Sequence, residues 1–445
     1  MKIYSILCSL ITLSLFPTFL KSQEKNEEQI VFSNVRIFDG KSPTLSKPLN
    51  VYIKDNKIEK IDAKPIVVKG KVININGNGK ILMPGLIDVH VHLTFGALTM
   101  EQMMSPDFNM NTAMKQVGQS TEATLMRGFT SVRDVGGPIF PLKAAVDKEQ
   151  IKGPRIWPSG AIISQTSGHG DFRTPDEKSR RFFGKASRAE EFGATFIADG
   201  RDEVLTATRE NLRFGASQIK LMAGGGTSSV YDPVDVTQYT LDEMKAAVDA
   251  AEDWGTYVTV HAYTPRAIRR AIDAGVKCIE HGQLLDESTL KLMADKGIWL
   301  STQNLLESSP EMTEMRKEKR KPVIEGQKKL WPMAKKLGVK LAWGTDFLFE
   351  PELNKEQNEY ILKLQPWFNN AEILKMVTHD NGELLQLSGL RSPYPGKIGV
   401  IEEGALADVL LVDGNPIEDL SVIAKPAKNF LVIVKDGKIY KNMIK

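Results

Sequence analysis

The sequence predicts an α/β fold in which a (β/α)8 barrel carries a small β-sandwich formed by both ends of the chain. Between residues 84 and 390, short apolar runs alternate with amphipathic helical segments, which is typical of βα repeats. The flanks, residues 30–83 and 391–445, instead show short alternating runs separated by turn residues. Because each flank alone is marginal as a sheet, we expect the two to pair into one domain.

The first residues have the pattern of a secretory signal. Lys2 precedes an apolar stretch from Ile3 to Leu20, and a polar segment follows. We therefore predict a signal peptide over residues 1–22 and a periplasmic or extracellular protein, with no stable membrane span after signal removal. A buried N-terminal helix or an uncleaved anchor is the alternative. After signal removal, Cys278 is the single cysteine that remains, so the mature fold does not depend on an intramolecular disulfide.

The elements follow in chain order. In the first flank, Asp55 and Asn56 lie at the bend of a predicted hairpin. In the middle, a capping box at Thr240 begins a helix that Gly255 ends, and the strand YVTVHA follows. The next repeats have the same plan. In the second flank, the Asp436-Gly437 pair predicts another hairpin. The middle region is therefore expected to be a TIM-like barrel.

The charge of the chain bears on whether it binds nucleic acid. The 445 residues carry a net charge of only +3, which gives no indication of a nucleic-acid partner. The basic run KEKRK, residues 317–321, lies between Glu314 and Glu325 without aromatic residues, so we interpret it as a solvated helix face.

Histidines in a buried strand give the first functional signal. In PGLIDVHVHL, residues 84–93, His90 and His92 are two apart, so an extended strand places both on one face. Two converging imidazoles indicate a metal site or a pair of core histidines satisfied by hydrogen bonds. His261, His281 and Asp346 each end a predicted barrel strand, and such ends surround one mouth of a barrel. This placement favours metal ligands.

Lys220, in the strand ASQIKLM, is an unusual neighbour for cations. A lysine with an ordinary pKa near ~10.4 is a cation and cannot bind metal. If CO2 carboxylates it, the resulting carbamate is an anion that can bridge two ions about 3.5–4 Å apart. A rim lysine in a salt bridge is the alternative interpretation.

These motifs resemble the amidohydrolase superfamily, in its binuclear, carboxylated-lysine branch. The likeness covers nearly all of residues 30–445, from MPGLIDVHVHL to GVIEEGALADVLLVDGNP. The segments GPRIWPSGAIISQTSGHGD, QIKLMAGGG, HAYTPRAIRRAIDAGVKCIEHG and WGTD are similar to the imidazolonepropionase-like group, which contains Xaa-Pro dipeptidases and an ochratoxin amidase. The resemblance implies two divalent ions, expected to be zinc, and an N6-carboxylated Lys220. The implied ligands are His90, His92, Lys220, His261, His281 and Asp346.

Catalysis would then need no protein nucleophile. Two cations lower the pKa of a shared water from 15.7 toward about 7, which supplies hydroxide at neutral pH. Asp346 would take its proton and pass it to the departing nitrogen. His169 and Tyr231 are predicted to contact the substrate, although a loop-stabilising role for His169 stays open. Asp88 is expected either to orient a ligand or to form hydrogen bonds at the rim, and His379 and Cys278 are interpreted as structural.

The expected activity is hydrolysis of the amide bond in a dipeptide or an N-acyl amino acid with a free carboxylate, Xaa-Pro dipeptidase-like or ochratoxin amidase-like. The alternatives are a cyclic-amide hydrolase with one metal ion and a non-catalytic barrel protein. Residues 308–321 and 348–360 are the expected specificity loops. The partners expected are small molecules or dipeptides, and relatives that form oligomers imply a possible homo-oligomer.

Overall fold

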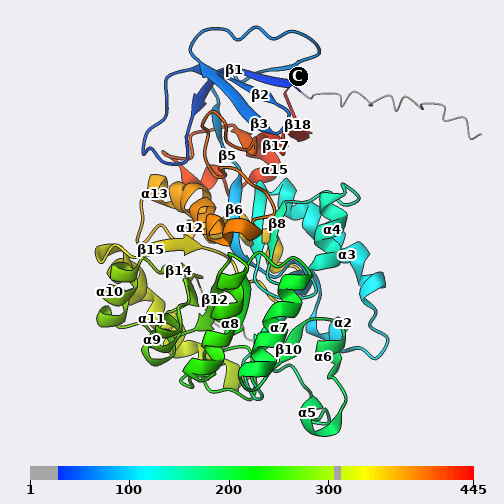
Figure 1. Cartoon of the computed structure of the whole chain (residues 1–445). Coiled ribbons are helices and arrows are strands. Elements are labelled where there is room, and N and C mark those ends of the chain that lie inside the picture. Colours follow the sequence, from blue (N-terminus) through cyan, green and yellow to red (C-terminus); the bar gives the residue numbers. More distant parts are fainter. Residues whose placement is uncertain (1–28, 305–311, 445) are drawn as a thin grey trace, which may run out of the picture.

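The computed structural model describes residues 29–304 and 312–444 of the chain (Figure 1). The predicted signal peptide, residues 1–22, lies outside the described residues, as do residues 308–311 of one predicted specificity loop. In the described part, no helix is long and apolar enough to cross a membrane. Its single cysteine, Cys278, is buried and free.

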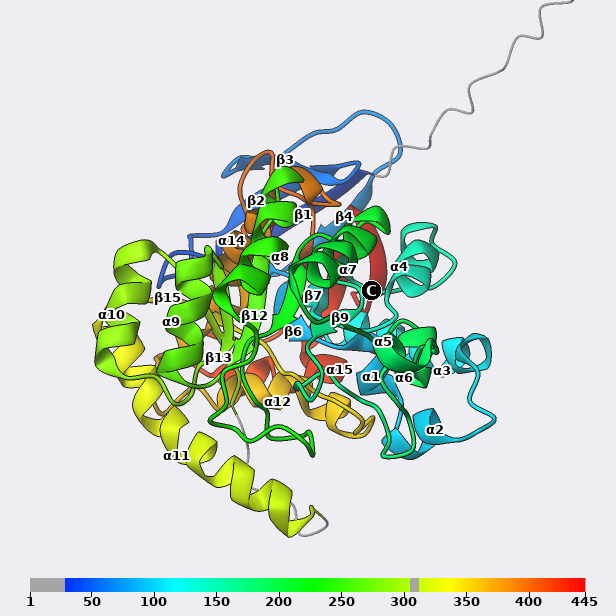
Figure 2. The same ribbon diagram turned by 60° about the horizontal axis from the view of Figure 1, so that its bottom comes forward.

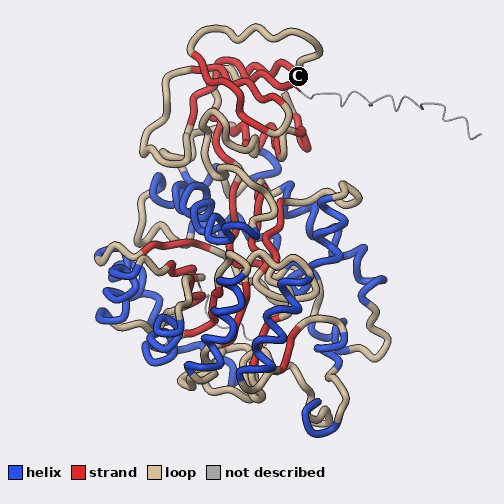
Figure 3. The backbone as a smooth tube through the Cα atoms, viewed as in Figure 1, coloured by secondary structure: helices blue, strands red, loops and turns tan. Residues whose placement is uncertain are grey.

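Both ends of the described chain join in one eight-stranded sheet, at the top of Figures 1 and 3. Its strands are β1 (Gln29–Ile37), β2 (Leu49–Lys54), β3 (Lys57–Asp62), β4 (Ile73–Asn76), β5 (Ile81–Pro84), β16 (Val409–Val412), β17 (Phe430–Lys435) and β18 (Lys438–Asn442). The order is β18-β17-β16-β5-β1-β2-β3, with β4 also paired to β1. The two flanks meet where β5 and β16 pair antiparallel, Leu82 opposite Leu411.

Turn chemistry explains both predicted hairpins. β2 turns into β3 at Asp55, and β17 turns into β18 at Asp436 and Gly437, all three with positive φ. A Cβ at residue 437 would lie 1.6 Å from the Asp55 carbonyl oxygen, so only glycine fits where the two turns meet. The two hairpin predictions are confirmed.

The middle of the chain contains parallel strands in two sheets. The first has β6 (Leu86–Val91), β7 (Phe129–Asp134) and β8 (Arg155–Pro158). The second has the order β10-β9-β11-β12-β13-β14-β15, with β9 (Ile162–Ser164), β10 (Thr195–Ile197), β11 (Ile219–Met222), β12 (Val258–Ala262), β13 (Cys278–His281), β14 (Trp299–Thr302) and β15 (Lys340–Trp343). Such parallel strands need helical crossovers between them.

Helices supply the crossovers and lie outside the strands (Figure 3). They are α1 (Leu93–Ala97), α2 (Met100–Met104), α3 (Met110–Met126), α4 (Phe140–Asp147), α5 (Arg180–Phe183), α6 (Arg188–Glu191), α7 (Arg201–Arg213), α8 (Leu241–Asp253), α9 (Pro265–Ala274), α10 (Glu287–Lys296), α11 (Glu314–Lys336), α12 (Gln357–Leu362), α13 (Asn370–Lys375), α14 (Asn381–Leu385) and α15 (Pro426–Asn429). Short 3-10 turns cover Leu353–Glu356, Gln386–Arg391 and Leu420–Val422, and a π-helical turn, Met376–Asp380, joins α13 to α14. The capping box predicted at Thr240 is present at the start of α8.

Hydrogen bonds connect the two parallel sheets in two places. The backbone N–H of Asp346, just after β15, donates to the carbonyl of His90 in β6 at 2.8 Å, and the Asn381 side chain bonds the backbones of both strands. At the other edge, the N–H of Ser217 donates to the carbonyl of Pro158 at 2.7 Å. The described strands therefore form a barrel-like α/β arrangement with a separate terminal sheet.

Candidate active site

All six side chains predicted as metal ligands line one cavity of about 380 Å³. They come from β6 and the residue that follows it, from β11, β12 and β13, and from the segment after β15. They divide into two groups. We call His90, His92 and Asp346 the histidine half, and Lys220, His261 and His281 the lysine half. The structure thus brings together residues that are 256 positions apart, from 90 to 346.

The histidine half is tightly assembled. The Nε2 atoms of His90 and His92 each lie 3.3 Å from Asp346 Oδ1, and one potential ligand atom from each residue lies within 4.8 Å of the others. Nδ1 of His92 is 2.8 Å from the Gly136 carbonyl, and Nδ1 of His90 is 2.8 Å from Glu280 Oε2. Both Nδ1 atoms are therefore engaged behind the site, and both Nε2 atoms face the cavity and Asp346.

The charges of the histidine half agree with this geometry. Burial alone would favour a neutral carboxyl, but His90 and His92 hold the pKa of Asp346 well below its usual range. Asp346 also has a left-handed backbone, with φ 57°, as has His281 with φ 77°. Such conformations cost on the order of 1–3 kcal/mol and concentrate at functional sites.

The lysine half is looser and electrostatically different. The rings of His261 and His281 lie 4.3 Å apart, and His281 Nδ1 is 4.0 Å from Asp346 Oδ2. His261 Nε2–H donates to the Gly225 carbonyl at 3.1 Å. Burial lowers the pKa of His261 and of His281 well below the ordinary value, and it also lowers the pKa of Lys220. Neutral imidazoles are the form that binds metal, and an uncharged amine is the form that reacts with CO2.

A buried ion pair behind His90 was not predicted from the sequence. Glu280 Oε2 accepts from His90, while its Oε1 accepts from Arg133 Nη2 at 2.6 Å and from the Thr259 hydroxyl. All of these side chains are fully or almost fully buried. The sequence did contain a signal for this ion pair. The strand VKCIEHG carries a carboxylate and the strand FTSVRD a guanidinium, and charges in buried strands need partners.

Two aspartates organise the backbone around the histidine half. Asp88 accepts from the N–H of His90 at 3.1 Å and from the N–H and hydroxyl of Thr345 at 3.2 and 2.7 Å. It therefore holds the backbone at His90, a predicted ligand, as one of its two expected roles requires. Asp134 accepts from the N–H groups of Leu93 and Gly136, and burial raises the pKa of its carboxyl to about 6.

The two predicted substrate contacts have different outcomes. His169 lines the cavity, where its ring stacks on His261 at 4.1 Å and its Nδ1 contacts Ser229 and the buried Asp232. Tyr231 is half exposed and is not among the described residues that line the cavity. The expectation that Tyr231 contacts the substrate stays a prediction. Tyr263, which sequence reasoning missed, lines the cavity instead.

Part of the basic run was interpreted wrongly. Arg320 lines the cavity, and Lys319 donates to the carbonyls of Ser229 and Asp232 at 2.7 and 2.8 Å. Lys321 is exposed, as expected of a solvated face. Helical periodicity explains the difference, because residues on one helix diverge by 100° per step and cannot all face solvent.

The residues interpreted as structural lie away from the cavity mouth. His379 bonds the neighbouring Asp380 at 2.8 Å. Cys278 is fully buried, and burial raises the pKa of its thiol to about 12, so it is an inert thiol.

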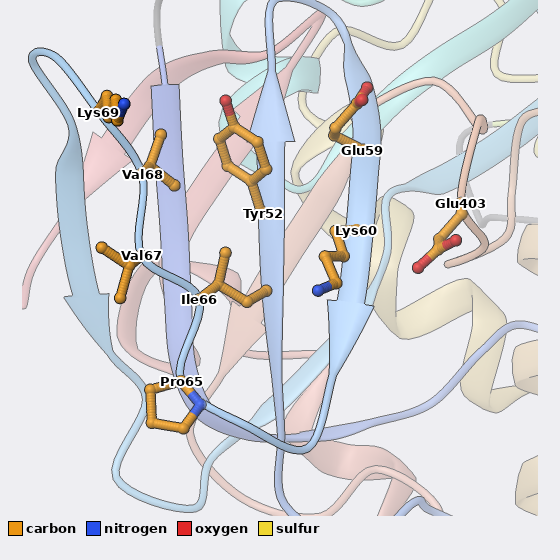
Figure 4. A pocket seen from close by; sticks show the side chains of 9 residues that line it. All are labelled: Tyr52, Glu59, Lys60, Pro65, Ile66, Val67, Val68, Lys69 and Glu403. Atoms are coloured by element: carbon orange, nitrogen blue, oxygen red, sulfur yellow. The ribbon is translucent and has the colours of Figure 1, made fainter.

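A second hollow, of about 570 Å³, lies on the terminal sheet. There residues 65–69 run in front of β1, beside the strand that carries Tyr52, with Val67 almost fully exposed (Figure 4). Its lining has no histidine, and its charged groups are Glu59, Lys60, Lys69 and Glu403. The catalytic chemistry therefore belongs to the first cavity.

Comparison with known proteins decides the family. Residues 81–445 match the model of the Amidohydrolase family. The chain belongs to this family. The amidohydrolase is 31% identical to an ochratoxinase of Aspergillus niger over 382 residues, which span 81% of this chain and 76% of that protein.

Solved structures agree with this assignment. A prolidase complexed with N-methylphosphonate-L-proline has a TM-score of 0.84 at 33% identity, covering 93% of this amidohydrolase and 100% of that chain. A Xaa-Pro dipeptidase with bound methionine has a TM-score of 0.78 at 28% identity, with coverage of 93% and 100%. The protein is therefore a hydrolase that acts on amide bonds, with a TIM-barrel-like fold and a separate domain.

The donor set of this amidohydrolase fits divalent metal ions, which its family generally binds. Imidazole nitrogens and a carboxylate are suitable ligands for zinc and several neighbouring ions. The Nδ1 atoms of His90 and His92 are already bonded behind the site, which is the arrangement that metal-binding histidines need.

Proposed function

We propose that this amidohydrolase cleaves the amide bond of a dipeptide or an N-acyl amino acid with a free carboxylate, using two divalent ions. The observation that carries the proposal is the common cavity of the six predicted ligands. A free-carboxylate substrate is further supported by relatives named for ochratoxin cleavage and for Xaa-Pro dipeptides, one of them complexed with a proline phosphonate.

The ligands would divide as the two halves do. His90 and His92 would hold one ion and His261 and His281 the other, with Asp346 and a carboxylated Lys220 completing the set. Lys220 is fully buried with a lowered pKa, so its amine is poised for carboxylation. When bound, zinc or a similar ion would polarise the substrate carbonyl and acidify water.

The remaining steps fall to side chains of the chain. Asp346, kept ionised by its histidine neighbours, would accept a proton from the attacking water and deliver it to the leaving nitrogen. His169 and the Tyr263 hydroxyl would hydrogen-bond the substrate, because both line the same cavity. Burial raises the pKa of Tyr263, which keeps it a hydrogen-bond donor at neutral pH.

Three further parts of the proposal concern the whole protein. We propose that the barrel strands close into a (β/α)8 barrel, that residues 30–83 and 391–445 form one domain beside a barrel of residues 84–390, and that residues 1–22 direct export. N-terminal sequencing of the mature protein tests export, and a first residue before position 20 would contradict it.

The activity test uses purified protein with measured metal content. The substrates are Xaa-Pro and Xaa-Arg dipeptides, N-aroylphenylalanine, a lactone and a cyclic ureide. We expect two metal equivalents per chain and turnover of the carboxylate-bearing amides. One equivalent with turnover of the cyclic ureide alone would instead indicate a cyclic-amide hydrolase, and absence of metal and of turnover would indicate a non-catalytic barrel.

A further inference from the structure

One wall of the catalytic cavity is cationic. Arg316 and Arg320 both line it, and they are four residues apart on α11, hence on the same helix face (Figure 2, lower left). Both side chains are only partly exposed. The Nε atom of Arg316 is buried and has no hydrogen-bond partner among the described residues. A guanidinium in this position is available to a bound anion.

Two sets of contacts hold α11 against the cavity, one between the arginines and one further along the helix. Lys319 Nζ bonds the carbonyls of Ser229 and Asp232, in the segment that also fixes His169. Further along the helix, Trp331 Nε1 donates to Asn304 Oδ1 at 3.0 Å, and Asn304 itself lines the cavity. The cationic wall is therefore part of the site's framework.

Another part of the lining is aromatic and uncharged. The ring of Phe95 lies 6.0 Å from the ring of His92, 5.5 Å from Phe349 and 6.4 Å from Phe172, and all of these rings line the cavity. Such a cluster accepts an apolar group and gives no partner to a carboxylate.

The other charges of the lining leave the arginines as the anion site. The proposed function assigns the buried Lys220 to the metal ligands, and the histidines hold Asp346 as an anion. Glu350 and Glu356 also line the cavity but are exposed, so solvent screens them. Glu350 does act on Arg320, and a bound carboxylate would compete with it.

We infer that Arg316 and Arg320 bind a carboxylate of the substrate and thereby set its direction in the cavity. The inference rests on the proposed function and deepens it. The carboxylate lies at α11, the scissile amide lies at the six predicted ligands, and an apolar group packs on Phe95, Phe172 and Phe349. Arginine suits this role because its planar fork matches a carboxylate. The carboxylate belongs either to the α-carbon or to an acidic side chain.

Matched substrates separate this role from a structural one. Metal-loaded wild type, Arg316→Gln and Arg320→Gln are assayed with N-benzoylphenylalanine and with its α-carboxamide, following release of benzoate. Lys321→Gln is the control, because it removes the same charge from an exposed position beside Arg320. N-benzoylglutamate and its α-carboxamide test the acidic side chain as the source of the carboxylate.

We expect each arginine variant to lower kcat/KM for the acid by about tenfold to a hundredfold, mainly through KM, as for the loss of a hydrogen bond to a charged group. Turnover of the α-carboxamide should change less than about twofold, and Arg320→Lys should recover part of the loss. Lys321→Gln should match wild type with every substrate. If N-benzoylglutamate and its α-carboxamide both show the loss and N-benzoylphenylalanine does not, the side-chain carboxylate is the group bound.

Equal losses for N-benzoylphenylalanine and its α-carboxamide, or no loss for any of the four compounds, would overturn the inference and leave the amide hydrolase intact. If wild type with two metal equivalents cleaves none of these compounds, the proposed function fails separately. The same compounds then serve as ligands in calorimetry, where binding of the acid that is unchanged in both arginine variants would reject the carboxylate site.

Discussion

The two halves of the site differ in how complete they are as metal sites. The histidine half has two oriented imidazoles and an ionised carboxylate within 4.8 Å of one another. The lysine half has two neutral imidazoles and a buried amine, which as an ammonium would repel a cation. Burial disfavours charge in both halves. In the histidine half the neighbouring imidazoles keep Asp346 ionised against it, whereas in the lysine half nothing comparable among the described residues does, and a modified lysine would supply the charge.

The largest expected effect comes from Lys220→Ala, which breaks the lysine half. Without the bridging anion, the variant should lose the metal pair and at least about a thousandfold in activity, since Lewis-acid stabilisation is worth several kcal/mol. Metal analysis and kcat/KM measure both. Added short carboxylic acids should restore part of each, because they replace the missing anion. Retention of two ions in the unrescued variant would contradict a bridging role.

The second effect concerns the support behind the histidine half. Arg133→Met leaves Glu280 as a buried, uncompensated charge, so the free energy of unfolding should fall by about 3–5 kcal/mol. Urea denaturation measures it. Arg133→Met combined with Glu280→Gln should be more stable than Arg133→Met alone, since the charge is then gone. Additive losses would show that the two side chains do not act as a pair.

A smaller effect is expected for Glu280→Gln, which keeps the shape of the side chain but weakens its hydrogen bond with His90. Metal affinity should fall by about tenfold to a hundredfold, as for other hydrogen-bond partners of ligands. Titration of the metal-free protein should show the loss mainly for the ion of the histidine half. Glu252→Gln, an exposed carboxylate paired with Lys277, is the control and should leave metal affinity unchanged.

The smallest effect is a pH dependence. Burial disfavours the Glu280 carboxylate, but Arg133 and His90 hold its pKa well below the ordinary value. A depressed folded pKa contributes stability that is present above about pH 4.3 and is lost as the pH falls toward the folded pKa. The urea midpoint of the metal-free protein should therefore fall between pH 5 and 3 more steeply in wild type than in Glu280→Gln. Parallel profiles would contradict this coupling.

Periodic patterns carried most of the sequence-based prediction. Alternating residues placed His90 and His92 on one face, and caps and turn residues such as Thr240 and Asp436 marked element ends. These signals are local, because backbone geometry repeats every two or 3.6 residues. The resemblance supplied the set of six ligands, which the structure gathers in one cavity.

Contacts across the fold could not be read in the same way. Tyr231 and Tyr263 are both tyrosines that follow site residues closely, but only Tyr263 lines the cavity. Neighbouring residues of the basic run 317–321 lie in different environments. The helix α11 turns Arg320 toward the cavity and leaves Lys321 exposed. Nothing local in the strand of Glu280 identifies Arg133 as its partner.

The sequence by itself determined the alternation of strands and helices, the β-rich flanks and the residues able to bind metal, since these depend on neighbours a few positions apart. Only the tertiary structure decided which charges are buried together, which tyrosine reaches the cavity and which arginines form its wall. Those outcomes depend on the distance between elements and on the loss of water around them, and both are set by packing of segments far apart in the chain.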